Sequence, residues 1–296
     1  MIVGNQGDTG AGGSLASRNL TRRVVSACVL VPLALGATYL GGWAFTAMCF
    51  IAAAAVLREW ASLKGHRPNP GLIVCGLSAL VLAGGLAGQG EDQPAIAVIM
   101  VGAILAAAVP LLPWSPATAL SSGWSASGMI YAGIVLLCPV FLRNDPQFGL
   151  QALVFLFAIV WATDILAYFV GRAVGGPLLW PRLSPNKTWA GAVGGALGGV
   201  AAGIAVAYAS GGPRAAVAGV LALILSIVAQ AGDLFESAVK RRFGVKDASN
   251  LIPGHGGMMD RLDGFLVAAL AAVLIGILRQ GIAQGLASPA RGLLAW

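Results

Sequence analysis

Charged residues are scarce in this chain, and many of them gather in one short segment. The 296 residues include 18 Lys or Arg and 11 Asp or Glu. Ten of these 29 charges lie between positions 230 and 264: Asp233, Glu236, Lys240, Arg241, Arg242, Lys246, Asp247, Asp260, Arg261 and Asp263. Carboxylates can hold a divalent metal, and Lys and Arg can neutralise phosphates. Metal-assisted phosphoryl or nucleotidyl transfer requires both.

Helical spacing predicts that several of these groups share a face. Asp233, Glu236 or Ser237, and Lys240 recur at intervals of three or four residues. Asp260 and Asp263 repeat this spacing at the start of the next apolar run, where a helix N-terminus favours carboxylates. Arg242 and Asp247 could equally be interfacial charges. Asp233 lies one or two turns inside an apolar run, where ionisable groups are costly and usually functional.

A glycine-rich loop separates these two groups of charges. It has the sequence Pro253-Gly254-His255-Gly256-Gly257. Glycines allow backbone N–H groups to approach an anion closely, so the loop is a candidate phosphate site beside Lys240, Arg241, Lys246 and Asp260. His255 could be a base or, as we favour, a hydrogen-bonding or structural residue.

A second polar cluster precedes another apolar run. Asp164 and Tyr168 are spaced as neighbours on a helix, and Ser184, Lys187 and Thr188 follow in the next loop. Ser184 and Thr188 could cap the helix after them. Capping does not explain Lys187, because a cation is unfavourable at a helix N-terminus unless an anion is nearby.

Composition places these clusters in a membrane protein. Hydrophobic residues make up 58 % of the chain and charged residues 10 %, with a mean hydropathy of +0.84. Soluble proteins have about 45–50 % and about 25 % respectively. We therefore expect an all-α, polytopic integral membrane protein. About nine runs are long enough to span: 24–42, 43–60, 71–89, 93–112, 119–142, 149–171, 189–210, 214–238 and 262–280, the fifth of which could start later.

The Lys and Arg distribution predicts the orientation. With a cytosolic N-terminus, 14 of the 18 Lys and Arg residues lie in cytosolic segments, and only Arg143, Arg214, Arg279 and Arg291 lie on the other side. Both polar clusters then face the cytosol, and the C-terminus lies outside. The net charge of +7 accordingly indicates topology and anionic lipid rather than nucleic acid.

The predicted organisation has four parts. We expect a mobile polar N-terminal tail over 1–22, N-terminal transmembrane helices over 23–148, a catalytic transmembrane region over 149–282 and a short C-terminal tail over 283–296. Within the third part, glycines recur every four residues at 191, 195, 199 and 203. They predict a smooth stripe against which a neighbouring helix packs closely.

The spaced polar pattern resembles the signature of the phosphatidate cytidylyltransferase (CDP-diacylglycerol synthase) family. The matching residues are Asp164, Ala167, Tyr168, Gly171, Arg172, Ser184, Pro185, Lys187, Thr188, Gly232, Asp233, Leu234, Glu236, Ser237, Lys240, Arg241, Lys246, Asp247, Pro253, His255, Gly256, Gly257, Asp260, Arg261 and Asp263. The detailed match covers roughly 160–265. Two positions, Asn186 and Ala190, depart from the commoner family pattern, in which a cation and an acid stand there.

The resemblance implies transfer of a cytidylyl group from CTP to phosphatidate, with Mg²⁺ and with a second cation left open. It implies an inner-membrane enzyme, often dimeric, with its site open to the cytosol. By position, Asp233 and Asp260 correspond to the metal-holding carboxylates, and both are expected to be catalytic together with Lys187 and Lys240. The expected substrate-binding residues are Asp164, Tyr168, Ser184, Thr188, Ser237, Arg241, Lys246, His255, Gly256, Gly257 and Arg261.

Two other classes of protein compete with this interpretation. An ion-coupled transporter would also place carboxylates and glycine breaks in its helices, but near the bilayer midplane rather than at the cytosolic helix ends. An enzyme that consumes a CDP-activated lipid would carry aspartates along a helical hairpin in the pattern D-G-x-x-A-R-x₈-G-x₃-D-x₃-D, which this sequence lacks.

Overall fold

The helices of the protein follow the apolar runs of its sequence. The computed structural model describes residues 25–26, 28–63, 69–113, 121–211, 215–252, 256–280 and 288–295. Eight helical segments there are long and apolar enough to cross a membrane: α2 (Gly42–Ser62), α3 (Pro70–Gly88), α4 (Asp92–Ala108) with the 3-10 helix η1 (Val109–Leu111), α5 (Ser122–Arg143), α6 (Gly149–Val174), α7 (Trp189–Ala209), α8 (Ala215–Arg242) and α9 (Met259–Gln280). The predicted all-α polytopic fold is confirmed.

The first predicted span corresponds to a shorter helix. An apolar helix covers Cys28–Leu40, and the predicted start of this span at residue 24 lies outside the described residues, as does the tail over 1–22. The chain leaves this helix at Gly41 and Gly42, whose φ angles are 65° and 50°. Glycine adopts such left-handed conformations without steric cost. This break separates the first two predicted spans where the sequence places their boundary.

Several helix starts are fixed by side-chain caps. The Asn69 side chain accepts a hydrogen bond from Gly71 N at the start of α3, and Pro70 occupies the first helical position. The Ser121 hydroxyl accepts from Trp124 N, so α5 begins at 122, later than the predicted 119. The Thr188 hydroxyl accepts from Gly191 N over 3.1 Å. Thr188 is therefore the N-cap of α7, one of the two roles that the sequence left open for it.

A short β-hairpin lies between α6 and α7. Its two strands are the only strands in the described part of the chain. Strands β1 (Leu178–Trp180) and β2 (Ser184–Thr188) pair antiparallel, with Leu178 opposite Thr188 and Trp180 opposite Ser184. This hairpin was not predicted from the sequence. Helix α6 ends at Gly175 and Gly176, whose φ angles are 67° and 94°. The next residue, Pro177, has no backbone N–H and cannot continue the helix.

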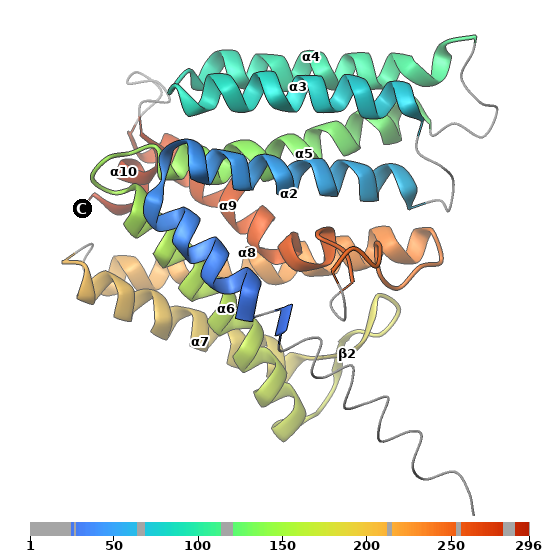
Figure 1. Ribbon diagram of the computed structural model, residues 1–296. Coiled ribbons are helices and arrows are strands. Elements are labelled where there is room, and N and C mark those ends of the chain that lie inside the picture. The colour runs from blue at the N-terminus through green and yellow to red at the C-terminus, as the bar shows by residue number, and fades with distance from the viewer. Residues whose placement is uncertain are drawn as a thin grey trace, which may run out of the picture.

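The loops lie at two opposite ends of the bundle, as alternating spans require. At one end, Arg143 Nε donates to Thr38 O over 2.7 Å, and Asn144 Nδ2 donates to Ala87 O over 2.8 Å. Helix α10 (Pro289–Leu294), within the predicted C-terminal tail, lies at this end against α9. The β-hairpin and the segment after α8 lie at the other end (Figure 1). The polar clusters therefore share one end of the bundle.

The glycine stripe of α7 packs against α6, as predicted. A Cβ added at Gly195 would lie 2.7 Å from Thr163 O and 2.9 Å from Ala167 Cβ, and one added at Gly191 would lie 2.7 Å from Ala167 O. Farther along α7, Gly203 approaches Ala222 of α8. Backbone-to-backbone contact of this kind maximises van der Waals packing, which drives helix association in lipid. It holds the hairpin and α7 close to α6.

We expect Gly195→Ala to destabilise the protein, although alanine is the better helix former. The new methyl group would meet the backbone of α6, and overpacking of this kind costs about 1–3 kcal/mol. The matched control is Gly85→Ala in α3, where an added Cβ meets nothing within 4 Å. That change should stabilise the helix by about 0.4–1 kcal/mol. Thermal unfolding in detergent checks both signs, and an equal response of the two variants would contradict the packing argument.

Candidate active site

Lys240 joins α8 and α9, the two helices that carry most of the charged residues of the segment 230–264. Lys240 Nζ in the last turn of α8 lies 3.1 Å from Glu236 Oε2 and 2.7 Å from Asp260 Oδ1. The i,i+4 spacing brings Glu236 and Lys240 together on α8, and the packing of α8 on α9 brings Asp260 to them. The Glu236 side chain is fully buried and that of Asp260 is 4 % exposed. An ammonium group at this position offsets the negative charge that the two buried carboxyl groups carry.

Asp260 also accepts two backbone hydrogen bonds from the loop before it. Its Oδ2 accepts from Gly257 N over 2.7 Å and from Ala248 N over 2.9 Å. Gly256 has a φ of 84°, and a Cβ there would lie 2.9 Å from Asp260 Oδ2. Glycine at 256 therefore permits both the turn and the close approach to the carboxylate. The sequence predicts that the Gly257 N–H binds a phosphate, but in the structure it donates to Asp260. His255, another predicted substrate-binding residue, lies outside the described residues.

A second ion pair forms between the hairpin and α8. Lys187, near the end of β2, pairs with Asp233 Oδ2, and each side chain is 31 % exposed. Asp233 is the anion that the sequence required near Lys187, because the lysine lies just before the N-terminus of α7. The hairpin supplies the geometry, since it returns the chain from the end of α6 toward α8. Lys187 and Asp233 are 46 residues apart and meet only in the folded protein.

Further carboxylates gather beside these pairs. Asp164 of α6 and Asp263 of α9 lie close enough to Asp233 and Glu236 of α8 for the four carboxyl groups to interact electrostatically. Two ionised carboxylates cannot donate to one another, and the buried Glu236 Oε1 accepts no hydrogen bond from any described donor. Glu236 and Asp263 therefore make a site where a proton or a cation is favoured. Both residues belong to the charged segment of the sequence, but no role was predicted for either of them.

The donor set fits a metal that is shared with phosphate ligands. Among the described residues, no three His, Cys, Asp or Glu side chains converge as a complete protein ligand set. Mg²⁺ is usually bound through one or two carboxylates, with water and substrate phosphates as its other ligands. The carboxylates of Asp233 and Asp260 are candidates of that kind, as is the buried Oε1 of Glu236, which accepts no hydrogen bond from any described residue. The predicted metal roles of Asp233 and Asp260 stay predictions.

The remaining predicted residues are distributed around this centre. Tyr168 is 58 % exposed, and its hydroxyl accepts from Arg172 Nη1 over 3.0 Å. Arg241 Nη1 donates to Val245 O over 3.3 Å. Lys246 and Arg261 are exposed, whereas Ser184 in β2 and Ser237 in α8 are half-buried. Their contributions to substrate binding stay predictions.

Glu59 is a residue of the site that was not predicted from the sequence. This carboxylate belongs to α2, far from the charged segment in sequence, yet it is only 3 % exposed and contacts the loop that precedes Asp260. The signal that could have found it is an acidic residue inside an apolar run, the same signal that identified Asp233.

The fold is that of a polytopic membrane protein, and paired lysines and carboxylates gather at one end of its helical bundle. The chain belongs to the cytidylyltransferase family, whose family model matches residues 21–278. It is therefore a nucleotidyltransferase. The ion pairs of Lys187 and Lys240 with Asp233, Glu236 and Asp260, together with the neighbouring Asp263, form what we call the charged centre. It lies wholly within the matched residues.

Curated relatives support this assignment. The chain is 44 % identical over 260 residues to a phosphatidate cytidylyltransferase of Brucella abortus. The aligned residues make up 87 % of this chain and 93 % of the relative. It is 36 % identical over 259 residues to a phosphatidate cytidylyltransferase of Pseudomonas aeruginosa, with 84 % and 94 % covered. A shorter match to the Bacillus subtilis enzyme of the same name is 39 % identical over 145 residues, 49 % of this chain and 54 % of the relative.

We expect Lys240→Met to destabilise the fold strongly, because it leaves Glu236 and Asp260 buried without their cation. Breaking a buried ion pair in this way costs about 3–5 kcal/mol. Adding Glu236→Gln should recover part of this loss, since it removes one of the uncompensated charges. Thermal unfolding in detergent checks the order of the variants. Arg241→Met, which removes an exposed cation one residue away, is the control and should change stability little. A single variant as stable as the unaltered protein would contradict the assigned role of Lys240.

Proposed function

We propose that this chain is a phosphatidate cytidylyltransferase, which converts CTP and phosphatidate into CDP-diacylglycerol and pyrophosphate in phospholipid biosynthesis. The observation that carries the proposal is the charged centre at one end of the bundle. There, Lys187 is held by Asp233 of α8, and Lys240 is held by Glu236 of α8 and Asp260 of α9. Family membership and the names of the curated relatives support the same reaction. The position of the centre lets a bilayer lipid meet a soluble nucleotide.

The reaction needs positioning and charge neutralisation more than a catalytic base. An oxygen of the phosphatidate phosphate is already anionic. It attacks the α-phosphorus of CTP in line, and the bond to the β-phosphate oxygen breaks as pyrophosphate leaves with the electron pair. Lys187 and Lys240 orient the phosphates and offset the repulsion between two polyanions. An ammonium group has three donors, and Lys240 uses two of them on Glu236 and Asp260, which leaves one for a phosphate oxygen.

Asp233 and Asp260 are the residues that we propose hold Mg²⁺, with Glu236 and Asp263 next to them. When bound, the ion would polarise the phosphate oxygens and stabilise charge on the leaving pyrophosphate. A second, monovalent or divalent cation would suit the mutually repelling pair Glu236 and Asp263. The same carboxylates keep Lys187 and Lys240 in place before substrates bind.

The geometry favours an enzyme over an ion-coupled carrier. The charged residues of α8 occupy its last ten positions, and Asp260 is the second residue of α9. A carrier would concentrate such residues near the bilayer midplane, on helices that are broken there. The described parts of α8 and α9 are continuous helices through their apolar length.

A radiolabel assay tests the reaction. Purified protein with Mg²⁺, phosphatidate and CTP labelled at the α-phosphate should transfer label into the lipid phase, whereas label at the γ-phosphate should stay in water as pyrophosphate. Asp233→Asn and Asp260→Asn should each abolish transfer while the protein remains folded and inserted. The control is Asp247→Asn, an exposed carboxylate in the same segment, which should keep most activity. Folded protein that leaves α-label in water would refute the proposed function.

We further propose that the protein lies in the inner membrane with its charged centre facing the cytosol, where CTP is available. The distribution of the 18 Lys and Arg residues supports this orientation. Its partners are then CTP and a membrane lipid. A homodimer, which the resemblance suggests, stays a prediction.

Cysteine labelling tests the orientation. In a background without the four native cysteines, an impermeant maleimide added to intact cells should modify Ala295→Cys but not Asn250→Cys. Both positions are exposed, and they lie at opposite ends of the bundle. Permeabilised cells should allow both to react, which controls for accessibility. The reverse pattern in intact cells would contradict the proposed orientation.

A further inference from the structure

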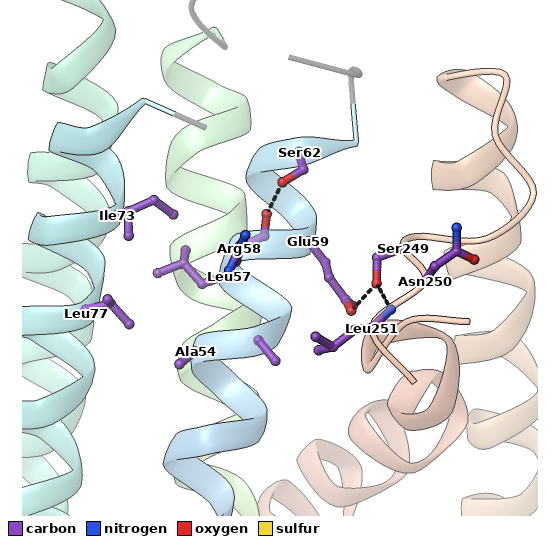
Figure 2. Close-up of a pocket in the computed structure, with 11 residues that line it drawn as sticks. Ala54, Leu57, Arg58, Glu59, Ser62, Ile73, Leu77, Ser249, Asn250 and Leu251 are labelled. Carbon is purple, nitrogen blue, oxygen red and sulfur yellow. Dashed lines mark hydrogen bonds between the residues drawn. The ribbon is translucent and has the colours of Figure 1, made fainter. Parts of the chain in front are cut away.

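A buried carboxylate of α2 contacts the loop between α8 and α9. Glu59 Oε1 accepts from the Ser249 hydroxyl over 2.6 Å and from Met258 N over 2.8 Å, and Glu59 Oε2 accepts from Met259 N over 2.8 Å. Figure 2 shows Glu59 extending from α2 toward Ser249, whose oxygen also accepts from Leu251 N. No salt bridge to Glu59 forms among the described residues, so neutral donors alone satisfy this side chain.

These contacts fix the start of α9. The first N–H groups of a helix have no partner within the helix, and they favour a negative charge. Glu59 satisfies two of them, at Met258 and Met259, from a different helix. Asp260 is the next residue along the chain, so the carboxylate of α2 sets the position of the backbone that carries Asp260.

The loop is held from two sides by two carboxylates. Asp260 accepts from Ala248 and Gly257, whereas Glu59 accepts from Ser249 and Met258, the residues that directly follow each of these. A Cβ at Gly257 would lie 2.7 Å from Glu59 Oε2, so glycine at this position permits the approach of α2.

The loop between α8 and α9 has little apolar contact with α2 beside Glu59. A cavity of about 620 Å³ lies between α2, α3 and residues 249–251, beside Glu59 (Figure 2). Leu251, on the wall of this cavity, is 55 % exposed. The loop therefore meets α2 beside open space, and the hydrogen bonds of Glu59 provide its polar attachment.

We infer that Glu59 is a positioning residue for the cytidylyl transfer reaction: it holds the loop and the start of α9 so that Asp260 keeps its geometry toward metal and phosphate. The inference rests on the proposed function. It also gives the N-terminal helices a part in catalysis, because α2 lies outside the segment that carries the charged centre.

The decisive variant is Glu59→Gln, which keeps the size of the side chain but replaces one acceptor oxygen by a donor. In either orientation of the amide, this donor faces a backbone N–H, that of Met258 or that of Met259. Substitutions of groups that orient a metal ligand typically cost 10- to 100-fold in metal affinity or activity. We expect the Mg²⁺ concentration for half-maximal rate to rise, and kcat to fall, within that range. The KM for phosphatidate should change less than twofold.

A matched carboxylate at the opposite end of the bundle provides the control. Asp145 accepts from Gln147 N, Phe148 N and the Ser288 hydroxyl, and it is 5 % exposed. Burial opposes its charged form, yet these hydrogen bonds and nearby Arg291 hold the pKa of Asp145 below its ordinary value. Asp145→Asn should therefore lower thermal stability, as Glu59→Gln does, without changing the Mg²⁺ dependence. An equal shift of that dependence in both variants would assign Glu59 a merely structural role and overturn the inference.

Hydrogen–deuterium exchange without substrates separates this inference from the proposed function. Glu59→Gln should accelerate exchange of the amides at 248–252 and 256–260, and Asp145→Asn should not. Ser249→Ala, which removes one of the three donors and is the milder change, should shift exchange and Mg²⁺ dependence in the same direction by less. Unchanged exchange and unchanged Mg²⁺ dependence in folded Glu59→Gln protein would overturn the inference. Accelerated exchange in a protein that transfers no cytidylyl group would instead refute the reaction and retain the attachment of the loop.

Discussion

The ammonium group of Lys240 lies between the carboxylates of Glu236 and Asp260, and the geometry of the charged centre depends on this contact. Buried charges are stable only where opposite charges or hydrogen-bond donors meet them. Lys240 therefore ties the end of α8 to the start of α9. Asp260 in turn orders the loop between them through Ala248 and Gly257.

The rest of the bundle brings further groups to this centre. The glycine stripe on α7 lets α6 approach at backbone distance, and the hairpin between these helices carries Lys187 to Asp233. On the other side, Glu59 of α2 reaches the same loop. Under the proposed function, the cations of this centre would bind phosphates and its carboxylates would hold a metal. The centre lies at one end of the bundle of apolar helices, where a lipid phosphate and a soluble nucleotide would both have to arrive.

Much of the fold could be predicted because the bilayer imposes simple rules on sequence. Runs of about 20 apolar residues mark the spans, and their ends agree with the helices within a few residues. The close packing of a neighbouring helix on α7 was also predictable, since glycine at every fourth position forms a single face. The structure shows that this neighbour is α6. The hairpin over 178–188 was not, because strand pairing in so short a segment depends on how α6 ends and α7 begins.

For the site, the sequence by itself determined which residue types are available and that Asp233 and Lys240 share one face of a helix, because helical spacing and depth in an apolar run are local properties. It also required an anion near Lys187. Only the tertiary structure decided that this anion is Asp233, that Lys240 lies between two carboxylates, and that Glu59 of α2 holds the loop before Asp260. Apart from Glu236 and Lys240, which lie one helical turn apart, those pairings join residues 20 to 200 positions apart. Helix packing fixes them, and no periodicity along the chain records which helices are neighbours.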